Sequence, residues 1–547
     1  MIADLPLTPN ALATQYREKG FWNDITIAES FASTAEKFGD KTALIMGDTS
    51  LSYSELAKQI NIVAANLVAL GLTPGQVVAG QLPNCTEIPL LHLACNTVGL
   101  LYMPLHDSWR EAELSHLLQL AEVQIVVSPG VYRDCDHNAM FRDIQAQAPS
   151  LKAIYSLGVT GENINAFDTL LVKPKNVDKL LAGRRPDPDA PAALMLSGGT
   201  TAISKISRFS SNNMLLMFEP AAHCAGFTSN DIACALAPAG TGATGYIYPI
   251  LMPLLLGATT VILPRWGDPK TAIDLIKNHQ CTYAVAIPAQ MTKMVPVLET
   301  MAADDLPTLR CFANAGAPLP FITATKIEEY LHCRIQSIYG STDGGVPTFT
   351  DINDPDDKRL KTVGRAAPFA ELKIWDEQGN EVATDEIGEV VWRCADKSWG
   401  YLGADDQTAS TFTPEGFYKS GDLGRLDAQG YLQITSIVCR KKDMILRGGR
   451  NISPQTIEVP LLSHPAVLDV AVAAKPDDIL GERACAFVVL NPNSTLEFVE
   501  MNDFLKSRDL AIWQLPEDLV ILDDLPRGAG GKVRKADLTA LFNEKKD

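Results

Sequence analysis

Short apolar runs alternate with helix-patterned segments from about residue 25 to residue 380. Runs such as "VVAGQLP", "LYMPL", "TTVILP" and "RCFANAG" are separated by segments such as "YSELAKQINIVAANLVALG", whose apolar positions recur at helical spacing. Apolar strands separated by helices form mostly parallel sheets that are covered on both faces. The alternation therefore predicts a large α/β N-terminal domain with mostly parallel sheets and flanking helices.

The pattern changes after residue 380. The stretches "GEVVWRC" and "GFYKSGDLGRLDAQGYLQIT" contain short strands and turns, and predict a small β-rich subdomain. Beyond "VCRKKDMILRGG" the chain has the mixed helix and strand pattern of a separate α+β unit. Because 547 residues exceed one ordinary core, we expect an N-terminal domain over residues 1–440 and a small C-terminal domain over residues 441–547.

Charge and composition exclude several classes of protein. The net charge of −18 argues against nucleic acid as the main partner, so local donors must bind any anionic substrate. Eleven scattered cysteines without a C-x-x-C pair indicate a reducing compartment, and the eight dispersed histidines argue against a zinc cluster. The opening "MIADLPLTPN" does not resemble a signal peptide. We therefore expect a cytoplasmic protein.

The stretch "YIYPILMPLLLGATTVIL" is apolar enough to raise the question of a membrane span. Pro249, Pro253 and Gly257 interrupt it. A buried helix followed by a buried strand is the favoured interpretation, and no membrane span is expected.

Two glycine-rich stretches suggest ligand binding. "SGGTTAISK" (197–205) lacks the order of a Walker phosphate loop, but its glycines, hydroxyls and lysine suit a polyphosphate. By itself it fits a mobile surface loop equally well. "GTGATG" (240–245) has dinucleotide-type spacing, yet Arg265 and Trp266 follow the next strand where an acidic residue is needed. A bend for close packing or for a substrate is favoured there.

Three later stretches favour the nucleotide interpretation. "IYGSTDGG" could stack a base, donate to a phosphate and hold Mg²⁺ through Asp343. Asp422 in "GFYKSGDLG" could accept both hydroxyls of a ribose, and "LPRGAGGKVRK" presents Lys532 on a glycine-rich tip. Each stretch alone is more often a plain turn, but chance seldom produces all of them in this order.

With these motifs, the chain resembles the acyl-adenylate-forming superfamily over nearly its whole length, from "LSYSELAKQ" and "LPNCTEI" to "GKVRK". "QYREKGFWNDITI" and "SGGTT" resemble stand-alone aryl-acid–AMP ligases, whereas "TGYIYPILMPLLLGATTVIL" resembles alicyclic and medium-chain acid–CoA ligases. The resemblance implies that ATP and Mg²⁺ activate a small carboxylic acid as acyl-AMP. The thiol of coenzyme A or of a carrier protein's phosphopantetheine then takes the acyl group, while the C-terminal domain rotates between the two half-reactions.

The resemblance also implies which residues bind ATP. The residues that would wrap the β- and γ-phosphates are Ser197, Gly199, Thr200, Thr201 and Lys205. Tyr339 would stack on adenine beside the backbone of Gly316, Ala317 and Pro318. Asp422 would bind the ribose, assisted by Arg440.

Four further residues carry implied roles in the reaction. Thr342 would reach the α-phosphate and Asp343 the Mg²⁺. Lys532 would bridge the acyl carboxylate and the α-phosphate, and Lys442 would be the hinge. Removing one preorganised donor costs about 10²–10³ in rate, which is the loss expected for Lys532 in adenylation.

The chain departs from the family pattern at four single positions and over residues 240–242. Single changes in the motifs are Ala202, Ser204, Asp343 in place of glutamate, and Cys439. The wall formed by Gly240 to Gly242 lacks the usual histidine or aromatic residue and an asparagine, which argues against a catechol acid. The residues expected to line the acid pocket are Thr244, Gly245, Tyr246 and Gly340.

Three functional hypotheses follow. The first is a ligase that joins a hydrophobic aryl, alicyclic or medium-chain acid to coenzyme A. The second is a stand-alone acyl-AMP ligase that loads a carrier protein. The third is a weakened homologue without efficient turnover, against which Lys205, Asp422, Arg440 and Lys532 argue. A monomer or homodimer is expected.

Overall fold

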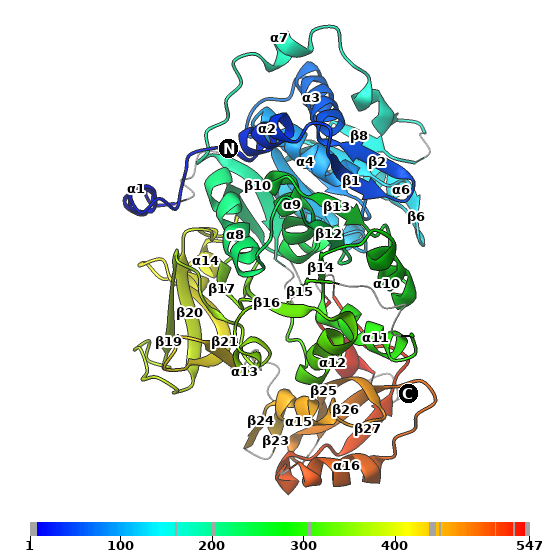
Figure 1. Ribbon diagram of the computed structural model, residues 1–547, viewed down its shortest axis with the longest axis vertical. Coiled ribbons are helices and arrows are strands. Elements are labelled where there is room, and N and C mark those ends of the chain that lie inside the picture. Colours follow the sequence, from blue (N-terminus) through cyan, green and yellow to red (C-terminus); the bar gives the residue numbers. More distant parts are fainter. Residues whose placement is uncertain are drawn as a thin grey trace.

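The computed structural model describes residues 8–158, 161–197, 204–302, 309–436, 445–447, 450–477, 479–508, 510–528 and 531–541. Figure 1 shows a large α/β body, a small sheet at its side and a C-terminal domain below it. The predicted domain boundary after residue 440 lies outside the described residues and stays a prediction.

The first sheet of the large body has nine strands. They are β1 (Thr42–Met46), β2 (Thr49–Ser52), β12 (Ile232–Ala235), β13 (Thr259–Ile262), β14 (Tyr283–Ala286), β15 (Cys311–Ala315), β16 (Arg334–Ser341), β17 (Gly345–Phe349) and β18 (Arg365–Ala366). Their order is β18-β17-β16-β15-β14-β12-β13-β1-β2. The strands from β16 to β1 run parallel, whereas β2, β17 and β18 are antiparallel at the two edges. The carboxyl ends of β14, β15 and β16 therefore meet at one edge of the sheet.

The second sheet has seven strands in the order β11-β10-β4-β3-β5-β8-β9. They are β3 (Val77–Gln81), β4 (Leu101–Leu105), β5 (Val123–Ser128), β8 (Ala153–Ser156), β9 (Ile164–Ala166), β10 (Pro191–Leu196) and β11 (Ile206–Ser210). All neighbours are parallel except β10 and β11, which form an antiparallel edge. A separate two-residue ribbon pairs β6 (Val131–Tyr132) with β7 (Cys135–Asp136).

Helices cover both faces of each sheet, as the alternation predicts. The helices described in the N-terminal part of the chain are α1 (Asn10–Glu18), α2 (Ile27–Lys37), α3 (Tyr53–Ala69), α4 (Glu87–Thr97), α5 (Glu111–Leu120), α6 (His137–Gln147), α7 (Val177–Leu181), α8 (Ser211–Cys224), α9 (Met252–Leu256), α10 (Pro269–Asn278), α11 (Pro288–Leu298), α12 (Phe321–Leu331), α13 (Asp356–Arg359) and α14 (Asp405–Thr411). On β14, Tyr283 and Val285 pack into the core shared with α2, α3, α4 and α8, whereas Ala284 packs into the core shared with α10, α11 and α12. Buried residues therefore alternate between two apolar cores along this strand.

Helix α3 shows how the sequence sets a boundary. The hydroxyl of Ser52 accepts a hydrogen bond from the backbone N–H of Glu55, and the Glu55 carboxylate accepts from the Ser52 N–H. This capping box satisfies two donors at the helix start, and such a cap contributes about 0.5–2 kcal/mol.

The apolar stretch 246–263 forms a helix followed by a strand, as predicted. Its first part is a π-helix over Ala243–Leu251, which continues into α9 and then β13. The helical spacing did not predict the π form. Within the described residues, the model contains no helix whose length and apolarity would let it cross a membrane.

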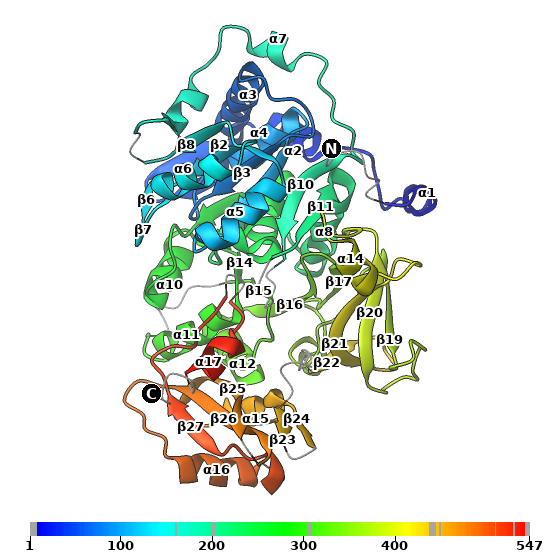
Figure 2. The same ribbon diagram turned by 180° about the vertical axis from the view of Figure 1, so that it is seen from behind.

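The β-rich subdomain and the C-terminal domain both match the prediction. The subdomain is an antiparallel sheet of β19 (Ala370–Trp375), β20 (Gly388–Cys394), β21 (Tyr418–Leu426) and β22 (Leu432–Ser436). The elements of the C-terminal domain are β23 (Ile445–Arg447), β24 (Arg450–Ile452), α15 (Pro454–Leu461), β25 (Val467–Asp477), β26 (Gly481–Leu490), α16 (Phe498–Ser507), β27 (Asp518–Ile521) and α17 (Lys535–Ala540). This domain has its own apolar core and lies against α11 of the large domain (Figure 2).

Candidate active site

The turn between β16 and β17 carries four of the predicted site residues. Tyr339 and Gly340 lie near the end of β16, which finishes at Ser341, and Thr342 and Asp343 lie in the turn. A Cβ added to Gly340 would lie 2.4 Å from the carbonyl oxygen of Gly345, so the two strands leave no room for a side chain.

Strand β20 and the segment after it hold this turn in place. The indole N–H of Trp392 donates to the Gly344 carbonyl at 2.6 Å. The backbone N–H of Ser398 donates to the Asp343 carbonyl at 3.1 Å. Because the turn is bonded to a second sheet, Thr342 and Asp343 have a fixed direction.

Two tyrosines hold the carboxylate of Asp343, which is only 7% exposed. The hydroxyl of Tyr418 donates to one oxygen at 3.0 Å, and the hydroxyl of Tyr401 donates to the other. Burial and the charge of Asp343 raise the pKa of both phenols well above the usual value of about 10, so both stay protonated and donate. A carboxylate can accept about four hydrogen bonds, so acceptor positions remain for a cation.

Lys205 stands at the end of the phosphate loop and contacts Tyr401. The backbone N–H of Ser197 donates to the Lys205 carbonyl at 3.0 Å, and the Lys205 N–H donates to the Ser197 hydroxyl at 3.2 Å, which closes the base of the loop. The ammonium of Lys205 lies 4.2 Å from the ring centroid of Tyr401. The predicted loop residues Gly199, Thr200 and Thr201 lie outside the described residues.

The predicted adenine and ribose residues also lie together. The hydroxyl of Tyr339 donates to the Asp422 carboxylate at 2.6 Å, and burial with the nearby Asp422 charge raises the pKa of that phenol. Residues 316–318 directly follow β15, whose Ala315 pairs with Ile338 of β16. The adenine and ribose residues are therefore neighbours at one sheet edge. Arg440 and Lys442 lie outside the described residues.

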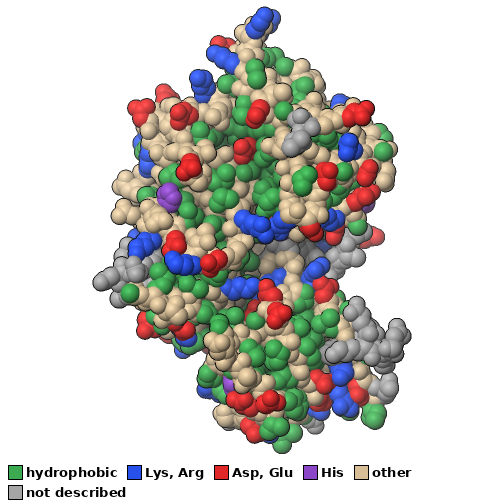
Figure 3. All heavy atoms as spheres, turned by 90° about the vertical axis from the view of Figure 1, so that its right-hand side faces the viewer, with side chains coloured by type: hydrophobic (Ala, Val, Ile, Leu, Met, Phe, Trp, Pro, Cys, Tyr) green, Lys and Arg blue, Asp and Glu red, His purple; other side chains and the backbone are tan. Residues whose placement is uncertain are grey.

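The tip that carries Lys532 approaches the same edge from the C-terminal domain. A Cβ added to Gly531 would lie 2.4 Å from the side chain of Ile287, the residue that follows β14. An ion pair of 2.7 Å between Lys293 and Asp524 also joins the two domains. Figure 3 shows a hollow between them with Lys and Arg side chains along its border, which supplies local positive charge to a strongly acidic protein.

Three of the four residues predicted for the acid pocket, Thr244, Gly245 and Tyr246, lie in the π-helix, whereas the fourth, Gly340, lies in β16. Thr244 and Tyr246 are buried, and the Tyr246 hydroxyl lies 2.7 Å from Nδ1 of His92. Burial lowers the pKa of His92 to about 3, so this histidine is neutral. A Cβ on Gly240 would lie 2.9 Å from the Cα of His106, and one on Gly245 would lie 1.8 Å from the Pro238 oxygen. These glycines allow close packing, and their part in an acid pocket stays a prediction.

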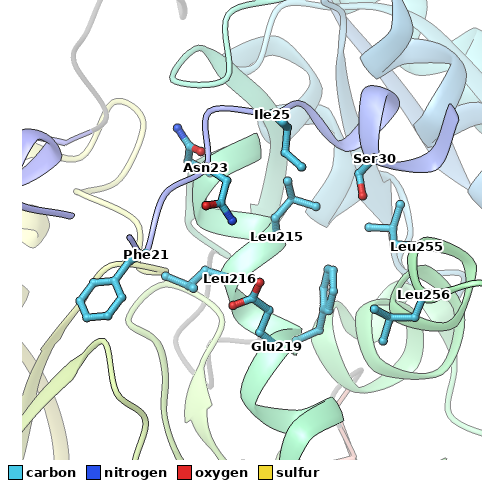
Figure 4. Close-up of a pocket in the computed structure, with 11 residues that line it drawn as sticks. Phe21, Asn23, Ile25, Ser30, Leu215, Leu216, Glu219, Leu255 and Leu256 are labelled. Atoms are coloured by element: carbon cyan, nitrogen blue, oxygen red, sulfur yellow. The ribbon is translucent and has the colours of Figure 1, made fainter. Parts of the chain in front are cut away.

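A groove elsewhere on the large domain contains none of the predicted site residues. It lies between the N-terminal segment and helices α8 and α9, and includes Phe21, Ser30, Leu216, Glu219 and Leu256 (Figure 4).

The residues of the site suit Mg²⁺ bound together with substrate phosphates, rather than a metal ion held by protein ligands alone. No group of three or more His, Cys, Asp or Glu side chains in the described parts of the chain could hold a metal ion. Mg²⁺ is typically bound by one or two carboxylates together with substrate phosphates and water. The buried carboxylate of Asp343 with free acceptor positions fits that arrangement.

Comparison with known proteins agrees with this geometry. Residues 31–402 match the AMP-binding enzyme family and residues 456–532 match the AMP-binding enzyme C-terminal domain. The chain therefore belongs to the AMP-binding enzyme family, and it is an ATP- and Mg²⁺-dependent, AMP-forming ligase.

Three similar proteins illustrate the range of this family. The chain is 32% identical to a medium-chain fatty-acid–CoA ligase of Escherichia coli (strain K12), over 95% of this chain and 91% of that protein. It is also 32% identical to a salicylyl-CoA synthase / salicylate adenylyltransferase of Streptomyces sp, over 98% of both chains. The solved apo structure of MbtA from Mycobacterium smegmatis has a TM-score of 0.72 and 30% identity, and the match covers 98% of both chains.

Sequence reasoning missed Tyr401 and Tyr418. Tyr418 lies in the stretch "GFYKSGDLG", in which only Asp422 was predicted as a site residue. Tyr401 lies in "WGYLG", which matches no motif used in the sequence analysis.

Proposed function

We propose that this ligase activates a hydrophobic aryl, alicyclic or medium-chain carboxylic acid and transfers the acyl group to coenzyme A. The observation that carries the proposal is two groups of contacts beside the end of β16, one joining Lys205, Tyr401 and Asp343 and the other joining Tyr339 and Asp422. These residues lie where the phosphates, metal and nucleoside of ATP are proposed to bind.

The chemistry brings two anions together. A carboxylate oxygen attacks the α-phosphorus, the bond to the β-phosphate breaks, and pyrophosphate leaves with the electron pair. A thiolate then attacks the acyl carbon, a C–S bond forms, and AMP leaves. Lys205 and Lys532 would offset negative charge in the first step. Asp343 would hold Mg²⁺, which would neutralise phosphate charge.

The relatives support the hydrophobic acid class, since one is named for medium-chain fatty acids and another for salicylate. A stand-alone ligase that loads a carrier protein is the second candidate. The N-terminal segment resembles such enzymes and favours this candidate. In the structure, this segment is fixed to the large domain by side-chain contacts. The indole N–H of Trp22 donates to the Ala395 carbonyl at 3.2 Å, and Arg17 forms an ion pair with Asp189 at 2.5 Å.

Mass spectrometry of the reaction products tests the proposal. The purified enzyme is incubated with MgATP and a panel of benzoates, cyclohexanecarboxylates and short- to medium-chain fatty acids, each with and without coenzyme A. Rapid formation of one class of acyl-CoA supports the first candidate and identifies the acid. Accumulation of acyl-AMP that does not react with coenzyme A supports the carrier-protein candidate. The absence of both products with every acid contradicts both candidates and favours a weakened homologue.

A pair of variants tests the proposed role of Lys532. Lys532→Ala is expected to slow acid-dependent pyrophosphate exchange about 10²–10³-fold. Arg534→Ala is the matched control, because Arg534 is an exposed cation two residues away whose ion pair to Asp537 is local. Equal rates for the two variants would contradict the role of Lys532.

A further inference from the structure

We propose that Tyr401 is a positioning residue that couples phosphate binding to metal binding, with the face of its ring holding Lys205 and its hydroxyl orienting Asp343. This inference rests on the proposed roles of those two residues toward ATP and Mg²⁺. It assigns to one buried side chain, 4% exposed, a link between two charged groups that the motifs place far apart in the sequence.

The position of Tyr401 is fixed on several sides. Its backbone N–H donates to the Thr408 hydroxyl at 2.9 Å, and the N–H of the next residue, Leu402, donates to the Ile206 carbonyl at 2.9 Å. Since Ile206 directly follows Lys205, the backbone itself aligns the tyrosine with the base of the phosphate loop. The ring also packs against Phe412, with 5.7 Å between the centroids.

The two ends of the side chain present different chemistry. The aromatic face attracts the ammonium of Lys205 at 4.2 Å, which reduces the number of orientations that the flexible lysine samples before phosphate binds. The hydroxyl donates to one oxygen of Asp343, while Tyr418 donates to the other. With both oxygens oriented, the shorter aspartate side chain presents its remaining acceptor positions in one direction.

Two substitutions separate these contributions. Tyr401→Phe keeps the ring face and removes the hydroxyl, whereas Tyr401→Leu removes both. The matched control is Tyr431→Phe, since the Tyr431 hydroxyl likewise donates to a buried carboxylate, Asp354, at 2.6 Å, outside the proposed site. The main readout is thermal stabilisation by a non-hydrolysable ATP analogue, titrated with Mg²⁺, which requires neither turnover nor knowledge of the acid.

We expect Tyr401→Phe to raise the half-saturating Mg²⁺ concentration about tenfold, while analogue affinity at saturating Mg²⁺ stays within about twofold. Tyr401→Leu should also weaken analogue affinity at saturating Mg²⁺, by about 3- to 10-fold. Circular dichroism checks that each variant folds, and Tyr401→Met replaces Tyr401→Leu if the latter does not.

Two outcomes overturn the inference in distinguishable ways. If Tyr401→Phe and Tyr431→Phe have the same Mg²⁺ dependence, the hydroxyl does not position the metal ligand. If Tyr401→Leu and Tyr401→Phe bind the analogue equally, the ring does not position Lys205. In both cases the wild-type protein still responds to Mg²⁺ and the analogue. A wild-type protein that responds to neither, and shows no pyrophosphate exchange, contradicts the proposed function itself.

Discussion

Replacing Gly340 by alanine adds one methyl group where β16 and β17 approach closely in the proposed site. The new Cβ would lie 2.4 Å from the Gly345 oxygen and 2.7 Å from the Val346 Cα. Both are backbone atoms of β17, so neither can rotate away. The two strands must separate locally, and overpacking of this kind costs about 1–3 kcal/mol.

The functional loss should exceed the loss of stability. Separation of the strands moves the turn that carries Thr342 and Asp343, and misplacing a reactive group by 1 Å can cost about 10²-fold in rate. We therefore expect Gly340→Ala to slow pyrophosphate exchange by about 10²-fold. The thermal midpoint should fall by only a few degrees, since each 1 kcal/mol shifts the midpoint of a large domain by about 2–4 °C.

Gly267→Ala is the matched control for this prediction. Neither glycine has a positive φ, and a Cβ on Gly267 would meet no atom within 4 Å. The two variants therefore differ in the space around the methyl group. Pyrophosphate exchange and thermal unfolding are measured for both. If Gly340→Ala retains wild-type exchange, the strand contact does not position the turn, and the reasoning is refuted.

Three further predictions concern other parts of the molecule. Tyr339→Phe removes the hydroxyl that donates to Asp422 at 2.6 Å. Hydrogen bonds to charged groups contribute about 1.5–3 kcal/mol, so ATP affinity, measured by calorimetry, should fall about tenfold or more. Unchanged affinity would show that Asp422 does not need the Tyr339 hydroxyl to bind ATP. Lys293→Glu should repel Asp524 across the domain contact and slow exchange about 2- to 5-fold at low salt. The double swap Lys293→Glu with Asp524→Lys should restore the rate, and no recovery would argue against direct pairing. Burial lowers the pKa of His92 to about 3 in the folded protein, below the pKa of about 6.5 expected in the unfolded chain. The stabilisation linked to this shift is therefore present above about pH 6.5 and is lost as pH falls toward 3. About 2 kcal/mol of unfolding free energy should disappear by pH 5, as measured by urea unfolding at pH 7 and pH 5. The same acid sensitivity in His92→Gln would contradict this assignment.

Local patterns in the sequence were enough to predict much of the fold. The run "TYAVAIP" predicted β14, and "YSELAKQINIVAANLVALG" predicted α3, because side-chain periodicity reports secondary structure within a short window. The π-helix over Ala243–Leu251 was not predicted, since Pro249 and two nearby glycines obscure the period and the neighbouring strands decide the form.

The class of fold and the order of the ATP-binding motifs could be predicted from the sequence, because each depends on residues close together in the chain. Which side chains meet depends on tertiary packing. Tyr401 and Tyr418 lie 58 and 75 residues from Asp343, and Tyr246 lies 154 residues from His92. No local pattern encodes such a pair. The two pairs with Asp343 are set by the way β20, β21 and the segment between them pack against the end of β16, and the pair of Tyr246 with His92 is set by the packing of the π-helix against α4.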